Sequence, residues 1–313
     1  ERFIQCLPKH RPLSFAIDIT NIPYYGKTKR KNGREVRRSK RKSGTTRFHG
    51  YATLYVVLYG RRYTIALRYL RPGEITVDIL KGFLEVINEH DLKVEMILMD
   101  KEFYNYRVIR ELKRQKIPAI IPIRRSKKGT GNSYLFSGRK SYKSTYTLSS
   151  SRKVRAWKVT FPVHIVVTYQ KGQNGKKGVT HLGYVVLYNA ASLKNVRKVY
   201  KKRFGIESSY RLMNIPRPRT TSRDPALRLL FVVISLLIQN LWIYTKWEYI
   251  HQPRQKVRDV KDRVLPLRSL LHLIAGYLYR VYGLVRYVPS VKPLDEDWVL
   301  KRIPKSIGQE VSV

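Results

Sequence analysis

The chain has 313 residues and carries 64 Lys and Arg against 21 Asp and Glu, which gives a formal net charge of +43, while 43% of its residues are hydrophobic. This composition excludes a disordered chain, and the single cysteine, Cys6, excludes a disulfide framework and a thiolate zinc site. The charge predicts a polyanionic partner: nucleic acid first, including the ribosome or nucleoid, and an anionic membrane surface second.

The first part of the chain predicts a strand followed by a hairpin. Leu13–Thr20 is an apolar, strand-like run with Asp18 near its end. Lys27–Arg47 contains eleven Lys and Arg, and its glycines predict a solvated loop or the tip of a long hairpin. Tyr51–Tyr59 and Arg62–Leu70 are rich in β-branched and aromatic residues and predict the two strands of a hairpin.

Helices and strands then alternate. Ile75–His90 has the apolar period of a helix, and Val94–Met99 is a short strand that stops at Asp100. Tyr104–Gln115 predicts a second helix and Pro118–Ile123 another buried strand. The order strand, hairpin, helix, strand, helix, strand predicts a mixed α/β layer of the ribonuclease H-like kind, flanked by helices.

The second half predicts a β-rich insertion followed by helices. Strand-like runs at Ala156–Tyr169 and Thr180–Tyr188 follow a segment rich in Ser, Lys, Gly and Tyr. Ser192–Met213 predicts a helix, and Asp224-Pro225 is an N-cap and first-turn pair that opens a helix to about Tyr249. Its uncharged stretch from residue 229 to 245 is marginal for a membrane span, so we interpret it as a buried core helix.

Pro266–Tyr282 predicts a final amphipathic helix. We therefore divide the chain into four parts: residues 1–122 as the first part of the core, 123–190 as the insertion, 191–250 as the second part of the core, and 251–313 as a helical extension. The sequence begins with Glu1 rather than methionine, which leaves open whether an upstream segment is missing, and we expect no signal peptide.

Three carboxylates stand out. Asp18 and Asp100 follow apolar runs, where strand ends place side chains at the rim of a sheet. Glu207 is the only acid between Lys194 and Arg219, a stretch with nine Lys and Arg. A lone carboxylate on a phosphate-binding surface repels DNA unless a metal ion lies between them. Oxygen ligands suit Mg²⁺, and three carboxylates predict a two-metal site for phosphodiester chemistry.

Each of these residues also has a simpler interpretation. Asp18 and Asp100 can cap turns or helices, as Asp often does after a strand. On a helix, Tyr200, Arg203 and Glu207 share one face, so Arg203 can form an ordinary i, i+4 ion pair with Glu207. Tyr200 is equally suited to packing.

The order Asp18, Asp100, Glu207 resembles the DDE transposases of prokaryotic insertion sequences. Within them it resembles the branch with the YREK motif, in which Tyr, Arg, Glu and Lys follow at fixed spacings, because Tyr200, Arg203 and Glu207 have the spacings of its first three residues. The run that begins at Asp100 is similar to that family's second motif, Asp-Arg-Gly-Phe. The resemblance covers roughly residues 13 to 249.

Two positions depart from the family pattern. Asn214 stands where the motif has Lys, so a contact to the transposon end is lost or moved to Arg211 or Arg217. Lys101 and Glu102 replace the usual Arg-Gly, which makes Glu102 a rival carboxylate beside Asp100.

The resemblance implies a set of DNA contacts, with Tyr200 and Arg203 near the scissile phosphate. The remaining predicted DNA-binding residues are the basic side chains of the same segment and of the Lys27–Arg47 stretch, where many positive charges attract the DNA backbone without reading its sequence: Lys201, Lys202, Arg211, Lys29, Arg30, Lys31, Arg37, Arg38, Lys40 and Arg41. The family also stacks a flipped base on an aromatic residue of its insertion. Trp157 is the candidate here, although its strand context favours core packing.

By this resemblance the protein is an Mg²⁺-dependent DDE transposase that cleaves transposon ends and joins the freed 3′-hydroxyl to target DNA. We expect two Mg²⁺ ions held by Asp18, Asp100 and Glu207, with Mn²⁺ able to substitute. We expect a homodimer on double-stranded DNA, no membrane partner, and a cytoplasmic, nucleoid-associated location in a prokaryote. The alternatives are another metal-dependent nuclease or resolvase of the same fold, or an inactive basic DNA-binding protein.

Overall fold

The computed structural model describes residues 2–5, 7–26, 35–58, 61–150, 157–171, 177–188, 191–203, 210–246 and 265–283. The chain forms two compact units, Glu1–Glu207 and Ser208–Val313, which are considered separately below.

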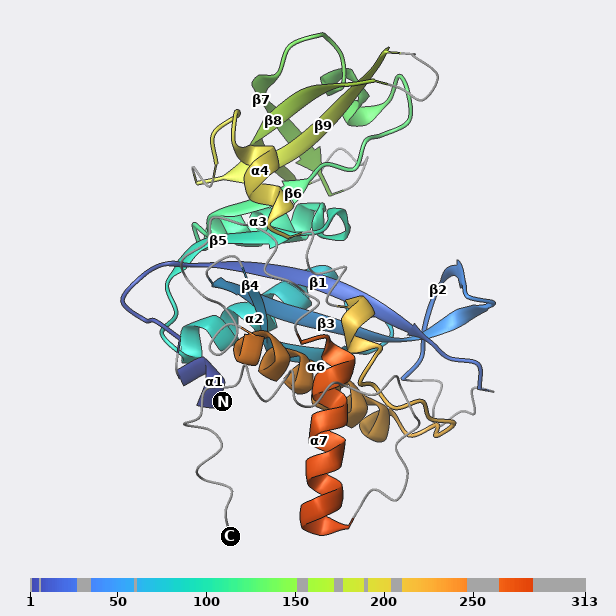
Figure 1. Cartoon of the computed structure of the whole chain (residues 1–313). Helices are drawn as coiled ribbons and strands as arrows, with labels where there is room; N and C mark the ends of the chain where they lie inside the picture. Colours follow the sequence, from blue (N-terminus) through green and yellow to red (C-terminus); the bar gives the residue numbers. More distant parts are fainter. Residues whose placement is uncertain are drawn as a thin grey trace. The chain divides into compact units, whose positions relative to one another are not determined.

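The first unit is built on one mixed, nine-stranded sheet with the strand order β2-β3-β1-β5-β6-β9-β8-β7, in which β4 also pairs with β3 (Figure 1). The strands are β1 Leu13–Pro23, β2 Arg37–Lys42, β3 Thr45–Leu58, β4 Arg61–Leu70, β5 Val94–Met99, β6 Ala119–Pro122, β7 Tyr142–Ser149, β8 Lys158–Lys171 and β9 Lys177–Leu187.

The centre of this sheet combines antiparallel and parallel pairing. Strand β1 is antiparallel to β3 and parallel to β5, and β6 continues parallel to β5. All four strands have buried residues, which indicates that the middle of the sheet is covered. The order β4-β3-β1-β5-β6, with helices between the parallel strands, is consistent with the predicted ribonuclease H-like nuclease fold.

Short connecting helices complete the first unit: α1 Arg2–Gln5, α2 Thr76–Glu89, η1 Lys101–Phe103, α3 Tyr106–Arg114, η2 Gly131–Leu135 and α4 Val196–Lys201. Helix α2 buries one apolar face, as its period predicts. Asn105 caps α3 by accepting a hydrogen bond from the Val108 amide, and its Nδ2 donates to Thr76 Oγ1 at 2.7 Å. This bond ties the start of α3 to the start of α2, and the two helices are in contact.

The basic stretch Lys27–Arg47 is partly a hairpin. Strands β2 and β3 pair from Arg37 to Phe48 and turn through Ser43 and Gly44, both with positive φ, as two-residue hairpin turns require. The hairpin-tip alternative is therefore confirmed for residues 35–47. The predicted contacts Lys29, Arg30 and Lys31 lie outside the described residues.

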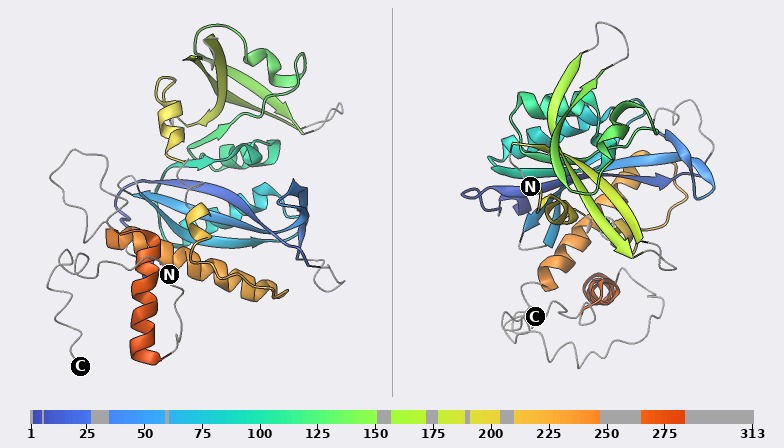
Figure 2. Two further views of the ribbon diagram at one scale, coloured as in Figure 1. Left: turned by 45° about the vertical axis from the view of Figure 1, so that its right-hand side comes forward. Right: turned by 90° about the horizontal axis from the view of Figure 1, so that it is seen from above.

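Between β6 and α4 lie strands β7, β8 and β9, in the segment predicted to be a β-rich insertion. Strand β9 is antiparallel to both β6 and β8, and β8 is antiparallel to β7. These three strands therefore extend the central sheet through β6. Figure 2 shows β8 and β9 as a long, twisted ribbon.

The predicted helix Ser192–Met213 is correct only in part, because the described helical residues within it are 196–201 and 210–213. Helix α4 begins at Val196 and ends at Lys201, and a turn at Lys202 and Arg203 follows. Residues 204–209 lie outside the described part of the chain, so Glu207 has no described position.

The second unit contains helices α6, Pro225–Thr245, and α7, Leu267–Tyr282. As predicted, Asp224 caps α6, accepting a hydrogen bond from the Ala226 amide at 2.9 Å. Trp242 Nε1 donates to the Leu265 carbonyl at 2.7 Å, which joins the end of α6 to the start of α7.

Helix α6 is only partly the buried core helix that its composition predicts. One face is buried around Val232, Ser235 and Leu236, whereas Leu230 and Leu237 are exposed. By length and hydropathy α6 could cross a membrane, a test that core helices of soluble proteins also pass. The buried Ser235 hydroxyl donates within the helix to the Val232 carbonyl, which satisfies its hydrogen-bonding need.

Candidate active site

Asp18 and Asp100 meet because of the register between β1 and β5. Ile17 pairs with Met99 in the last matched position of the parallel ladder, so the next residue on each strand is an aspartate. Strand β5 ends at Met99, as predicted. The prediction that Asp18 lies near the end of its strand is wrong, because β1 continues to Pro23 alongside β3. Asp18 therefore lies where the parallel partner stops.

Neither aspartate acts as a helix cap. Asp100 occupies the N-cap position of η1, but its side chain makes no capping hydrogen bond. Asp18 Oδ1 accepts a hydrogen bond from the adjacent Ile19 amide at 2.9 Å. The capping interpretation therefore does not explain why the two carboxylates are brought together.

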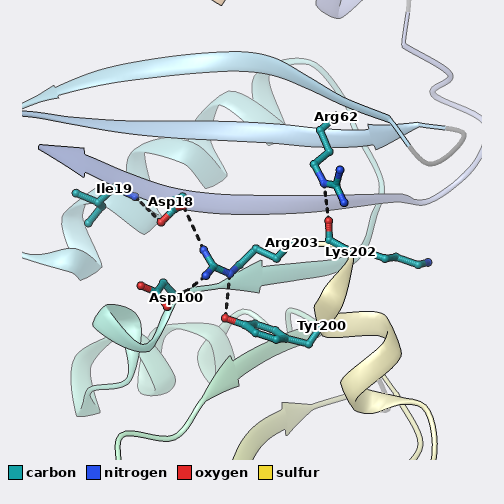
Figure 3. Close-up of polar contacts among 7 residues, drawn as sticks. All are labelled: Asp18, Ile19, Arg62, Asp100, Tyr200, Lys202 and Arg203. Atoms are coloured by element: carbon teal, nitrogen blue, oxygen red, sulfur yellow. Dashed lines mark hydrogen bonds and ion pairs between the residues drawn. The ribbon is translucent and has the colours of Figure 1, made fainter. Parts of the chain in front are cut away.

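The guanidinium of Arg203 lies between the two carboxylates (Figure 3). Arg203 Nη1 is 3.2 Å from Asp18 Oδ2, and Nη2 is 3.4 Å from Asp100 Oδ1. On its other side, Arg203 Nε donates to the Tyr200 hydroxyl at 2.9 Å. Arg203 is 4% exposed, so these charges interact away from bulk solvent.

Burial dominates the electrostatics of Asp18. It raises the pKa of the Asp18 carboxyl from 3.8 to about 6, although Arg203 and the Ile19 amide act in the opposite direction. The charges of Asp100 and Glu102 raise that pKa further. Burial also raises the pKa of Tyr200, so its hydroxyl stays protonated. A positive charge beside the Asp18 carboxyl favours its ionised form and so opposes the effect of burial.

Two contacts fix the end of α4, and with it Arg203. Arg62 on β4 donates from Nε to the Lys202 carbonyl at 2.5 Å (Figure 3). The ring of Tyr200 packs against Tyr184 on β9, with ring centroids 5.3 Å apart. Burial lowers the pKa of Arg62. Nothing local in the sequence predicts this role for Arg62, because its partner is a backbone carbonyl 140 residues away.

Asp18 and Asp100 fit two ligands of a divalent cation. Both present carboxylate oxygens to one buried positive group, and carboxylate oxygen is the donor that Mg²⁺ prefers. Within the described residues, no group of three His, Cys, Asp or Glu side chains could hold a metal. The third predicted ligand, Glu207, lies outside them.

Comparison with known proteins bears on the fold. No family model matches the sequence, and no curated protein matches it significantly. The piggyBac transposase in its synaptic complex with hairpin DNA is structurally similar, with a TM-score of 0.51 and 12% identity over 93% of this chain. The fold is like that of a transposase. This chain spans 57% of the length of that transposase chain.

Two DNA complexes of Ciona intestinalis endonuclease V are more distant. One has 12% identity and a TM-score of 0.29, covering 61% of this chain and 77% of the endonuclease. The other has 10% identity and a TM-score of 0.30, covering 72% of this chain and 85% of the endonuclease.

Several predicted DNA-binding side chains are exposed. They lie on the β2–β3 hairpin and at the end of α4, and Arg211 lies in the second unit: Arg38, Lys40, Arg41, Lys201, Lys202 and Arg211. Arg37, also on the hairpin, is half-buried. The exposed cations are therefore accessible to solvent.

The two departures from the family pattern have defined surroundings. Glu102 is exposed, and Asp100 rather than Glu102 contacts Arg203. Asn214 Oδ1 accepts hydrogen bonds from Arg217 at 3.0 and 3.2 Å, so Arg217 is held beside the position where the motif has Lys.

Trp157 corrects one prediction. Core packing was favoured, but Trp157 is 65% exposed, and the Arg110 guanidinium lies 4.9 Å from its ring centroid. This cation–π contact joins α3 to the start of β8 at the surface.

Proposed function

We propose that this protein is a metal-dependent DNA transposase of the DDE type, in the branch with the YREK motif. The observation that carries the proposal is the convergence of Asp18 and Asp100 on Arg203, the arginine of that motif, with Tyr200 hydrogen-bonded behind it. Residues that are far apart in the sequence and suited to one chemistry meet in one cluster, in which Asp18, Tyr200 and Arg203 are buried and Asp100 is half-buried. The transposase-like fold supports the proposal.

The metal site would be formed by Asp18, Asp100 and Glu207, with Mg²⁺ as the expected cation. When bound, Mg²⁺ supplies activation of a water or a 3′-hydroxyl and stabilisation of the leaving oxygen. The chain's own contribution is positioning. The β1–β5 register orients the two aspartates, and the β4 and β9 contacts hold α4 so that Arg203 and Tyr200 lie beside them.

In the proposed reaction, water attacks a phosphodiester at the transposon end, and the 3′-oxygen leaves as a hydroxyl. That 3′-hydroxyl then attacks a phosphodiester of target DNA, forming a new bond while the target's own 3′-oxygen departs. Both steps need little covalent chemistry from the protein, because phosphoryl transfer depends on positioning and charge stabilisation.

The test is strand joining. Purified protein is incubated with Mg²⁺, a target plasmid and labelled DNA taken from the genomic region that flanks its coding sequence. We expect label to become covalently attached to the plasmid, and no product when EDTA is present. Cleavage without joining would favour another nuclease or resolvase of this fold. Binding that is unaffected by EDTA, with neither product, would favour an inactive DNA-binding protein.

The β2–β3 hairpin is the best candidate for the DNA-backbone contact. It is an exposed two-stranded ribbon, a shape that fits the major groove, and it carries Arg38, Lys40, Arg41 and Lys42 on its surface (Figure 1). Basic side chains occupy four of the five exposed positions of β2, so positive charge runs along this ribbon.

Replacing Lys40 and Arg41 together by Gln is expected to weaken DNA binding and to reduce the slope of log K against log salt by about 1.8, because each lost phosphate contact contributes about 0.9. Fluorescence anisotropy with labelled duplex at several salt concentrations measures the slope. The matched control is Lys81→Gln with Lys93→Gln, two exposed residues outside the hairpin. An equal fall in slope for both pairs would show that the hairpin has no special role.

A further inference from the structure

We propose that the Arg203 side chain is a built-in replacement for the divalent cation, which holds Asp18 and Asp100 together until a metal ion displaces it. This inference rests on the proposed metal site. It assigns Arg203 a positioning role before metal binding, separate from any contact that Arg203 makes with DNA.

The first observation is that Arg203 contacts one oxygen of each carboxylate. Its two terminal nitrogens face Asp18 Oδ2 and Asp100 Oδ1, one to each carboxylate, at 3.2 and 3.4 Å. A divalent ion bound to the same oxygens would face the guanidinium as a like charge. The two cations therefore compete for one pair of carboxylates.

The second observation is that the cluster needs a cation. Asp18 is 8% exposed, and two neighbouring carboxylates repel each other when both are ionised. Removing the partner of a buried charge is strongly destabilising. Arg203 neutralises this repulsion, so the β1–β5 end of the sheet can stay ordered without metal.

The third observation is that Arg203 can leave without dismantling the site. It lies in the turn after α4, beyond the last helical residue, Lys201. The neighbouring backbone is anchored separately, because Arg62 holds the Lys202 carbonyl. Rotation of the Arg203 side chain, with loss of its Nε hydrogen bond to the Tyr200 hydroxyl, would release the carboxylates, while Arg62 keeps the end of α4 in place.

The test compares Mn²⁺ binding, without DNA, in wild-type protein and in Arg203→Gln, with free Mn²⁺ measured by electron paramagnetic resonance. We expect Arg203→Gln to bind Mn²⁺ about tenfold more tightly, because the competing cation is gone. Lys202→Gln is the matched control, because it removes the same charge from an exposed side chain that is adjacent to Arg203 in the sequence. The Mn²⁺ affinity of this variant should differ from that of wild type by less than about twofold.

Weaker Mn²⁺ binding by Arg203→Gln would overturn the inference, because it would mean that Arg203 organises the ligands and does not compete with the ion. Unchanged binding would overturn it as well. The variant Asp100→Asn distinguishes failure of the displacement inference from failure of the proposed function. If Mn²⁺ binding to wild-type protein does not depend on Asp100, the metal site itself is wrong.

A second measurement uses the wild-type protein, in case Arg203→Gln does not fold. With ¹⁵N at arginine Nε, Mg²⁺ addition is expected to shift the Arg203 Nε–H resonance and accelerate its exchange with solvent. The Nε–H of Arg62, which donates to a backbone carbonyl, should not change. An Arg203 signal that is unaffected at saturating Mg²⁺ would contradict displacement.

Discussion

Asp100→Asn is expected to reduce the rate of DNA cleavage by at least about 10³-fold, which corresponds to roughly 4 kcal/mol of transition-state stabilisation. The amide keeps the shape of the carboxylate but removes the charge that would bind the cation. DNA binding should change little, since phosphate contacts come from basic side chains elsewhere. Cleavage is measured as nicking of a supercoiled plasmid carrying the flanking genomic DNA, and binding is measured by anisotropy.

Glu102→Gln is the matched control, because Glu102 is the neighbouring carboxylate that the sequence leaves as a rival. Glu102 is exposed and contributes to the site only through its charge near Asp18. We expect the rate of DNA cleavage by Glu102→Gln to stay within about threefold of the wild-type rate. If Glu102→Gln lost activity and Asp100→Asn kept it, the ligand assignment would move to Glu102. If both variants cleaved normally, the proposed site would be wrong.

The core of the fold could be predicted because its signals are local. The apolar run Val94–Met99 ends at a charged residue, and β5 ends at the same place. The period of Ile75–His90 gives α2 to within a residue at each end. What could not be predicted is pairing over long distances. Residues 21 to 23 remain in β1 because they pair with β3, and nothing in their own sequence signals that partner.

The candidate site shows the same limit. Asp18 and Asp100 could be identified from the sequence, but Arg203 was predicted as a contact for DNA or for Glu207. Its contact with both aspartates is a property of three-dimensional structure, as is the Arg62 contact with Lys202. Such pairings leave no trace in periodicity or composition.

Trp157 shows how a correct periodicity can mislead. Val159, Phe161 and Val163 are buried, so the two-residue period of a strand places Trp157 on the same, inward side. However, Trp157 precedes the first residue of β8, and the last β7–β8 pair is Ser149 with Lys158. Alternation predicts burial only where the partner strand is present to cover the side chain.

Asp18→Asn is expected to abolish cleavage and, at the same time, to stabilise the metal-free protein. Asparagine has the shape of the neutral carboxylic acid and can still accept the hydrogen bond from the Ile19 amide. Burial raises the Asp18 pKa from 3.8 to about 6, so ionisation is unfavourable in the folded state. At pH 7 the difference between the folded and unfolded pKa of Asp18 lowers the unfolding free energy of the wild-type protein by about 3 kcal/mol. Asp18→Asn removes this cost, so its Tm should be higher by roughly 5–10 °C.

The pH dependence distinguishes this cause from a general effect of the substitution. A raised carboxyl pKa means that the folded protein binds the proton more tightly than the unfolded chain. Wild-type stability therefore falls as the pH rises from about 4 to 6, and the advantage of Asp18→Asn grows over the same window. Glu85→Gln, on the exposed face of α2, is the matched control for removing one carboxylate charge far from the site.

Mn²⁺ should reverse the order of stability. It is expected to raise the Tm of wild-type protein, since a ligand that binds only the folded state stabilises it, and to raise the Tm of Asp18→Asn much less. Differential scanning calorimetry from pH 4 to 8, with and without Mn²⁺, makes all these comparisons. An Asp18→Asn protein that is no more stable than wild type at pH 7 would mean that Arg203 fully compensates the buried charge. That outcome would contradict the expected cost of ionising the buried Asp18 carboxyl.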